Sequence, residues 1–99
     1  MYKVFLGIRA KTQIERELSF WASKNKKYSN RIAVEIQEII NFGLPVNPHR
    51  GSNSLKKPGY KILYPGKGDF KLVYRIIEKD KIIKVTHFFH SSREISNYI

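Results

Sequence analysis

The residues best suited to chemistry lie in the last third of the chain. The segment 82–90 (IIKVTHFFH) ends in a His90-x-x-Arg93 step, and the segment 70–77 before it carries Arg75. An arginine side chain makes forked, charge-assisted hydrogen bonds to carboxylate or phosphate groups. We therefore expect this part of the chain to bind a phosphate-rich or acidic target rather than to serve as a passive scaffold.

The net charge points to the same class of target. The chain has 19 Lys and Arg against 8 Asp and Glu, a formal charge of +11. A charge this far from zero attracts polyanions, and it says more about partners than about fold. RNA, DNA and a strongly acidic protein are the partners that fit.

Length and composition narrow the class of protein. The 99 residues make one domain, 1–99. The composition, 41% hydrophobic and 13% aromatic residues, argues against disorder. The chain has no cysteine, so a disulfide framework and a thiolate zinc site are excluded. No apolar run approaches the ~20 residues that cross a bilayer. The composition therefore predicts a soluble, cytoplasmic domain with no cofactor, no metal site and no membrane partner.

Two helices are predicted in the first half of the chain. The spacing Thr12-Gln13-Ile14-Glu15 has the form of a capping box, which begins a helix at that threonine. Ser29 or Asn30 is expected to cap the second helix, and Gly43, followed by a proline, is expected to end it. Because so few residues join these helices, they should form an antiparallel hairpin.

Strands are predicted on both sides of this helical hairpin. The segment 2–8 alternates as a strand does, 44–58 reads as a long loop, and strand character returns at 60–64, 70–77 and 82–90. The predicted class is α+β with the order β-α-α-β-β-β. The N-terminal helical hairpin packs on one face of a mostly antiparallel four-stranded sheet.

Strand alternation predicts which side chains face away from the helices. The residues expected to face them are Tyr60, Ile62, Tyr64, Leu72, Tyr74, Ile76, Ile83, Val85, His87 and Phe89. The expected outward set mixes cations with apolar residues: Lys3, Phe5, Arg9, Lys61, Leu63, Lys71, Val73, Arg75, Lys84, Thr86, Phe88 and His90. Such a face suits a phosphate backbone with stacked bases, or an amphipathic protein segment.

Two aromatic positions on the predicted core elements receive different interpretations. His87 on the predicted core face is expected to be a neutral, hydrogen-bonded histidine rather than a catalytic one. Phe20 lies off the apolar stripe of the first helix, so an exposed phenylalanine there predicts a contact with a partner.

The element order and four short segments together are typical of a known family. The segments are Ala10-Lys11-x-x-Ile14, Gly59-Tyr60-Lys61, Leu72-Val73-Tyr74-Arg75 and His90-x-x-Arg93-Glu94. In these features, over nearly its whole length, the chain resembles the RelE/ParE superfamily of toxins from bacterial type II toxin–antitoxin modules. The resemblance implies a growth-inhibiting toxin that a cognate antitoxin, here an acidic one, holds in check. Phe20, Lys84 and Phe88 are the residues expected to contact that antitoxin.

One branch of the superfamily, RelE-like, cleaves mRNA on the ribosome. By position, Lys61 and Lys71 would stabilise the scissile phosphate, Arg93 would supply further charge and Tyr98 would stack on a base. Metal-free cleavage needs such charges around the phosphorane. Leu63 departs from this pattern, because RelE has a second lysine at that position.

The other branch, ParE-like, inhibits DNA gyrase and has no chemistry of its own. The His-x-x-Arg-Glu ending and the Ala-Lys start of the first helix are closer to ParE, which is the preferred interpretation. Arg75, His90, Arg93 and Tyr98 are then the residues expected to bind the target. A third interpretation is a small, non-toxic module that binds single-stranded nucleic acid through Phe5, Phe88 and the lysines.

Overall fold

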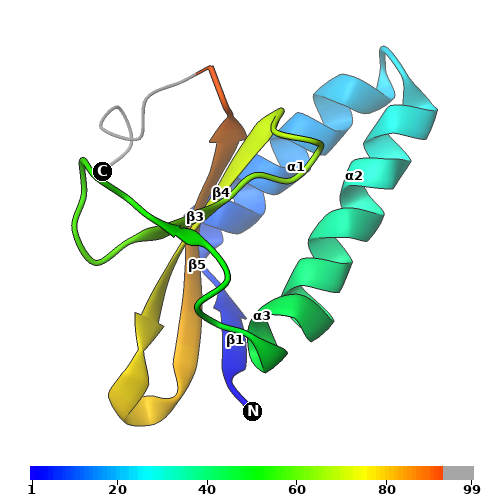
Figure 1. Ribbon diagram of the computed structural model, residues 1–99. Coiled ribbons are helices and arrows are strands. Elements are labelled where there is room, and N and C mark those ends of the chain that lie inside the picture. Colours follow the sequence, from blue (N-terminus) through cyan, green and yellow to red (C-terminus); the bar gives the residue numbers. More distant parts are fainter. Residues whose placement is uncertain (93–99) are drawn as a thin grey trace.

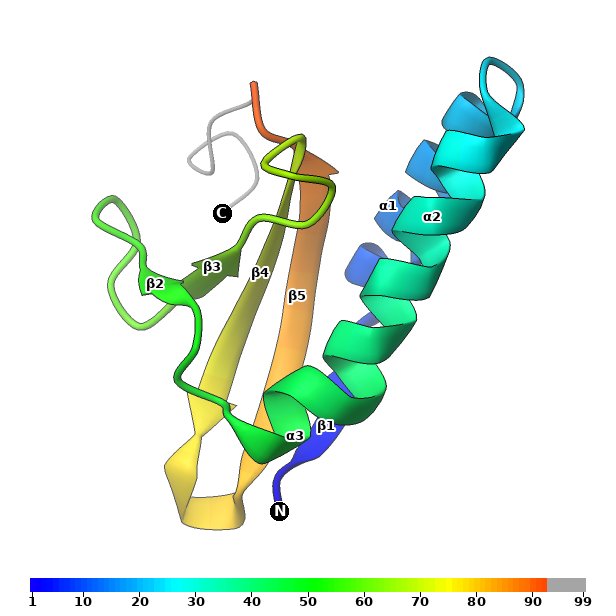
Figure 2. The ribbon, with the colours of Figure 1, turned by 45° about the vertical axis from the view of Figure 1, so that its right-hand side comes forward.

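The computed structural model describes residues 1–92 of the chain, which form two layers (Figures 1 and 2). A helical hairpin of α1 (Ile8–Ala22) and α2 (Lys26–Glu38) covers one face of a five-stranded sheet. The strands, in chain order, are β1 (Lys3–Leu6), β2 (Ser52–Asn53), β3 (Lys61–Leu63), β4 (Phe70–Ile77) and β5 (Ile82–His90). The α+β class and the helical hairpin on one face are confirmed.

The sheet has one strand more than predicted, and one of its four strand pairs is parallel. The strand order is β1-β5-β4-β3-β2, so β5 and β4 are central. β1 runs parallel to β5, with Val4 opposite Ile83, whereas the other three pairs are antiparallel. The prediction of four strands is wrong because β2, only Ser52–Asn53, pairs with β3 inside a segment that reads as a loop.

Both helices begin earlier than predicted. α1 starts at Ile8 directly after Gly7, which makes no side-chain cap, so the predicted capping box at Thr12 lies inside the helix. Ala10 is fully buried in the main core, and this packing requires the helix to begin before it. α2 is capped by Asn25, whose side chain accepts the Tyr28 N–H at 3.1 Å.

The helical segment that contains α2 continues past Gly43, where it was predicted to end. α2 itself ends at Glu38 and is followed by a π-helical turn, Ile39–Gly43, and by a short helix, α3 (Leu44–Val46). Pro45 sits in the first turn of α3, where a proline removes no hydrogen bond that the helix needs. Leu44 is fully buried, so this extension adds to the core.

The side chains of α2 also hold the turn between β3 and β4. The Glu35 carboxylate accepts the Gly66 N–H with its two oxygens at 3.1 and 3.2 Å. The Tyr28 hydroxyl donates to Asp69 Oδ2 at 2.5 Å. The second helix and this turn are therefore fixed to one another at two points.

The main core lies between the helices and the sheet face that they cover, which we call the inner face. Its largest fully buried side chains include Tyr74, Phe70 and Phe88, and the rings of Phe70 and Phe88 stack at 5.1 Å. A second, smaller cluster of Ile62, Val73 and Phe89 lies on the opposite, outer face.

A β-bulge reverses the predicted faces at the end of β5. Val73 pairs with His87 and Tyr74 pairs with Val85, so Thr86 is an extra residue on β5. Phe88 therefore turns to the inner face, while His87 and Phe89 turn to the outer one. The predicted outward positions of Phe88 and His90 and the predicted inward positions of His87 and Phe89 are wrong for this reason.

The short strand β3 is also reversed relative to the prediction. Leu63 pairs with Leu72 and packs against the main core, whereas Ile62 belongs to the outer cluster. Lys61 pairs with Tyr74, so it lies on the inner side of the sheet. The predicted outward positions of Lys61 and Leu63 and the predicted inward positions of Tyr60 and Ile62 are wrong, because pairing with β4 sets the phase of a strand that is only three residues long.

Candidate functional site

The outer face of the sheet carries basic side chains around an apolar centre. The centre is the buried cluster of Ile62, Val73 and Phe89. Residues of the three strands β3–β5 and of the segment before β3 share this face: Tyr60, Ile62, Lys71, Val73, Arg75, Lys84, His87 and Phe89. Arg75 and Lys84 are exposed, and Lys71 is half-buried.

Aromatic rings hold two of these cations in place. The Arg75 guanidinium lies 5.3 Å from the centre of the Tyr60 ring, and the Lys71 ammonium lies 6.0 Å from the centre of the Phe89 ring. A ring face attracts a cation without neutralising it. The two rings therefore help to position these cations on the outer face.

The two exposed cations of this face stand directly opposite each other. Arg75 on β4 pairs with Lys84 on β5. Like charges in this arrangement destabilise a sheet, so the pair contributes nothing to folding. It produces a local concentration of positive charge, which we call the Arg75–Lys84 pair, at the surface of the central hairpin.

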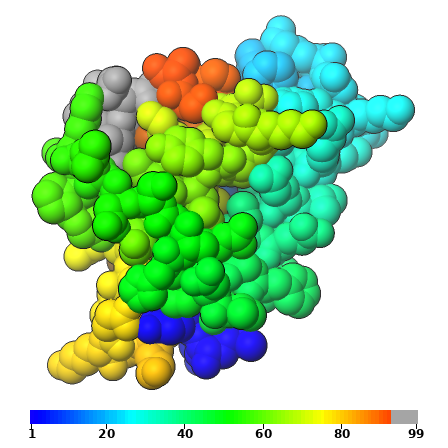
Figure 3. All heavy atoms as spheres, in the orientation of Figure 1, coloured from blue at the N-terminus to red at the C-terminus, as the bar shows by residue number. Residues whose placement is uncertain are grey.

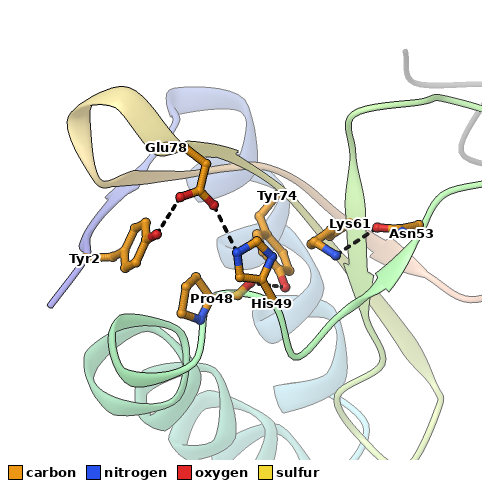
Figure 4. Close-up of polar contacts among 7 residues, drawn as sticks. All are labelled: Tyr2, Pro48, His49, Asn53, Lys61, Tyr74 and Glu78. Carbon is orange, nitrogen blue, oxygen red and sulfur yellow. Dashed lines mark hydrogen bonds and ion pairs between the residues drawn. The ribbon is translucent and has the colours of Figure 1, made fainter.

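The two lysines of the predicted catalytic set are not brought together. Lys71 is on the outer face, whereas Lys61 is on the inner side of β3 and donates from Nζ to Asn53 Oδ1 at 2.8 Å (Figure 4). Leu63, where the nuclease pattern has a lysine, packs against the core. Arg93 and Tyr98, the other members of that set, lie outside the described residues.

His90 is at the end of β5 on the inner side of the strand. Its ring meets the Phe70 ring edge-on at 5.7 Å. The Ser92 backbone N–H donates to His90 Nδ1 at 3.2 Å, and the Ser92 hydroxyl lies 2.9 Å from the same nitrogen. His90 is half-buried, and it is not on the same face as Arg75.

The three predicted antitoxin contacts have different environments. Phe20 is 50% exposed on α1, with the Lys24 ammonium 5.1 Å from its ring centre, as its position off the apolar stripe predicted. Lys84 is exposed on the outer face. Phe88 is buried in the main core and has no surface with which to contact a partner.

One polar cluster has no counterpart in the sequence analysis (Figure 4). Glu78 accepts the Tyr2 hydroxyl at 2.6 Å with one oxygen, and its other oxygen lies 2.9 Å from His49 Nε2. The Tyr2 hydroxyl holds the pKa of the Glu78 carboxyl below its ordinary value, and Glu78 in turn raises the pKa of Tyr2. Both carboxylate oxygens are occupied, so the cluster ties three distant segments together.

The Tyr74 side chain holds the loop between α3 and β2 in place. Its hydroxyl donates to the Pro48 carbonyl at 2.8 Å and accepts the Gly51 N–H at 2.9 Å. Burial raises the pKa of Tyr74. Its ring approaches Gly51 so closely that a Cβ there would meet the hydroxyl at 2.6 Å, which requires glycine at this position. No group of acidic, histidine or cysteine side chains within residues 1–92 is arranged to hold a metal ion.

The helical hairpin presents an apolar groove on its surface. A hollow of about 380 Å³ lies between α1 and α2, and its lining includes Leu6, Ile14, Leu18, Val34 and Ile40. Val34 is 53% exposed at its rim. Such a groove is wide enough to receive apolar side chains of a partner segment. None of the helices in residues 1–92 meets the length and apolarity that a membrane span requires.

By sequence, the chain matches no protein-family model and no curated protein. Its fold is similar to solved structures that cover almost the whole chain. A chain of the toxin–antitoxin complex RelBE2 from Mycobacterium tuberculosis aligns over 90% of this chain and 96% of its own length, with 20% identity and a TM-score of 0.66.

Two further structures have the same fold. A chain of the chromosomal ParDE system from P. aeruginosa aligns over 91% of this chain and 96% of its own length, with 13% identity and a TM-score of 0.65. The isolated RelE toxin of E. coli aligns over 98% of this chain and 92% of its own length, with 17% identity and a TM-score of 0.59. At these identities the likeness establishes the fold that the chain shares with them.

Proposed function

We propose that the chain is the toxin of a type II toxin–antitoxin module, that it inhibits bacterial growth through DNA gyrase in the manner of ParE, and that an acidic antitoxin neutralises it. The fold shared with toxin–antitoxin proteins over at least 90% of the chain supports the first part. The net charge of +11 supports an acidic neutralising partner.

The separation of Lys61 from Lys71 carries the choice of gyrase over mRNA. Cleavage of RNA without a metal needs several charges aimed at one phosphorane. Lys61 is on the inner side of β3, Lys71 is on the outer face, and Leu63 is part of the core. This arrangement supports a protein that binds its target rather than one that cleaves it.

The target surface in this proposal combines the Arg75–Lys84 pair with the end of β5. Arg75 is exposed and already oriented by the Tyr60 ring, so it loses little freedom when it pairs with a carboxylate. His90 lies at the end of β5, and Arg93 and Tyr98 follow it in sequence. We assign these four residues, Arg75, His90, Arg93 and Tyr98, to the target.

The antitoxin surface in this proposal is the helical hairpin. Phe20 is half-exposed on α1, and the apolar groove between α1 and α2 is open to solvent along Val34. An amphipathic acidic segment fits both features, because its apolar side chains enter the groove and its carboxylates meet Lys24. Lys84 lies on the outer face, so a further part of the antitoxin, beyond the hairpin, contacts it. Phe88 is not part of this surface, since it is buried.

Controlled expression of the chain alone tests the proposal. We expect growth to stop, plasmid DNA to lose negative supercoiling, and co-expression of the neighbouring acidic gene product to restore both. The matched variant is Arg75→Ala, which should lower gyrase inhibition at unchanged protein level. Normal growth at verified expression would instead favour a non-toxic nucleic-acid-binding module.

The same cultures separate the two branches of the superfamily. Mapping of transcript ends should show no new cuts in translated messages, and Lys61→Ala with Lys71→Ala should leave the growth arrest unchanged. Codon-specific cuts that these two substitutions abolish would overturn the gyrase assignment in favour of a ribosome-dependent endoribonuclease.

A further inference from the structure

The segment between β2 and β3 forms a closed, ordered loop. Ser54 is buried at the base of this loop, where its N–H donates to the Tyr60 carbonyl at 2.9 Å and its side-chain oxygen accepts the Lys57 N–H at 3.0 Å. The Tyr60 N–H donates to the Lys57 carbonyl at 3.2 Å. Gly59 closes the loop with a φ of 90°, which favours glycine. These contacts hold the loop in one shape.

This loop holds the side chain of Leu55 exposed to solvent. Leu55 is 97% exposed, the highest fraction among the exposed large hydrophobic side chains of residues 1–92. Single exposed leucines are common on protein surfaces. Leu55 is distinct because its loop is closed at the base and stands out from the sheet at the left of Figures 1 and 3. Lys56 and Lys57 follow it directly.

The loop leads into the positive part of the outer face. It ends at Tyr60, whose ring lies under the Arg75 guanidinium at 5.3 Å. Lys84 lies opposite Arg75 on the neighbouring strand β5. The apolar tip is therefore followed in the chain by two lysines, and its loop ends beside the Arg75–Lys84 pair. An apolar anchor with charged contacts around it is typical of a protein-binding surface.

We infer that Leu55 is an anchor that enters an apolar socket of the protein target, with carboxylates around the socket facing Lys57 and Arg75. This inference rests on the proposed function, and the target is then DNA gyrase. A protein fits better than a nucleic acid because an aliphatic side chain offers no ring on which a base can stack. When a leucine fills an apolar socket, water is released from both surfaces, which favours binding.

The inference is tested with purified gyrase, the full-length chain and three substitutions. Leu55→Ser removes the anchor, Leu55→Met keeps an apolar side chain of similar size, and Ile8→Ser is the matched control. Ile8 is 86% exposed and follows β1, at the opposite edge of the sheet from the loop. Circular dichroism and thermal melting should be unchanged for all three, because neither position is buried.

We expect Leu55→Ser to weaken inhibition of supercoiling and binding to gyrase by about tenfold to a hundredfold, the usual effect of removing a buried apolar anchor. Leu55→Met and Ile8→Ser should inhibit and bind gyrase as the wild type does, and the two Leu55 variants should bind antitoxin as the wild type does. Wild-type inhibition by Leu55→Ser overturns the inference and leaves the proposed function standing.

Other outcomes are also decisive. If the wild-type chain does not bind gyrase, the proposed function fails and this inference fails with it. If Leu55→Ser instead loses affinity for the antitoxin, or for a single-stranded RNA oligonucleotide used as a probe, the loop serves a different partner and the inference is overturned.

Discussion

Single side chains hold the outer-face geometry in place. Gln13 on α1 accepts the Phe88 N–H at 2.7 Å with its side-chain oxygen, just beyond the bulge of β5. No strand of residues 1–92 pairs with β5 at this point on the β1 side, because β1 ends at Leu6. A glutamine of the helix thus replaces a missing strand and keeps Phe88 turned inward.

Replacement of Gln13 should therefore cost more stability than its position on a helix suggests. Gln13→Ala leaves the Phe88 N–H without its acceptor, and an unsatisfied buried donor costs about 1–3 kcal/mol. Urea unfolding measures this loss. The matched control is Thr12→Ala, which should have little effect because Thr12 is exposed inside α1. A larger loss for Thr12→Ala would mean that the predicted capping box forms after all.

Tyr28 makes folding stability depend on alkaline pH. Burial, and next the hydrogen bond to Asp69, raise the pKa of Tyr28 to about 12 from 10.0. A raised pKa stabilises the fold fully below pH 10, and this contribution is lost as the pH rises through 12. Tyr28→Phe should therefore flatten the decrease in stability between pH 10 and 12. Thermal melting across this range checks it, with Tyr64→Phe, an exposed ring, as the control.

At the scale of elements, the central hairpin of β4 and β5 carries the candidate site at a cost in stability. Arg75 and Lys84 repel each other across the two strands. Proteins commonly keep such a destabilising feature where it serves binding. The rest of the hairpin offsets the lost stability, because it fully buries Phe70, Tyr74 and Phe88.

Reversal of one charge of this pair should separate stability from function. Lys84→Glu turns the repulsion into attraction and should raise the free energy of unfolding by about 0.2–1 kcal/mol. Lys84→Gln, which only removes the repulsion, should give a smaller gain. Chemical unfolding measures both, and binding to antitoxin should weaken in parallel for Lys84→Glu. An unchanged stability would show that solvent screens the pair completely.

The sequence predicted most strands but not the side that each side chain faces. Alternation assigned Leu72, Tyr74 and Ile76 of β4 to the helices, and they pack there. In β5, the extra residue Thr86 reverses the phase, and nothing in its sequence marks a bulge. In β3, three residues are too few for alternation to decide, so Lys61 was assigned to the wrong face.

The candidate site was predictable only where it depends on local pattern. Arg75 and Lys84 stand at regular strand positions, and the sequence assigned both to the outer face correctly. The link between Tyr2, His49 and Glu78 has no sequence signal, because its members are far apart in the chain and each is an ordinary surface residue. Such links follow from topology, which composition and spacing do not encode.

At the scale of the whole molecule, the described part of the chain contains a complete architecture. Both helices, all five strands and the main core lie within residues 1–92. Arg93 and Tyr98, which we propose as target contacts, are beyond this part. Folding and target binding can therefore be tested separately by shortening the chain.

Truncation after Ser92 should remove toxicity and leave the fold intact. We expect the circular dichroism spectrum and antitoxin binding to remain as in the full chain, while inhibition of gyrase is lost with Arg93 and Tyr98. A growth assay paired with antitoxin titration measures both. Retained toxicity would assign the target contact to Arg75 and its neighbours alone, and loss of folding would give the removed residues a structural role.

The parallel pairing of β1 with β5 also sets when a newly made chain can complete its fold. β1 leaves the ribosome first, but its partner follows roughly 80 residues later, which at 5–20 residues per second is a delay of roughly 4 to 16 seconds. Until β5 emerges, neither β1 nor β4 has its central neighbour, and the outer face does not exist. Under the function proposed above, the chain therefore leaves the ribosome without its target surface, which forms in one late folding step that an antitoxin already present can intercept.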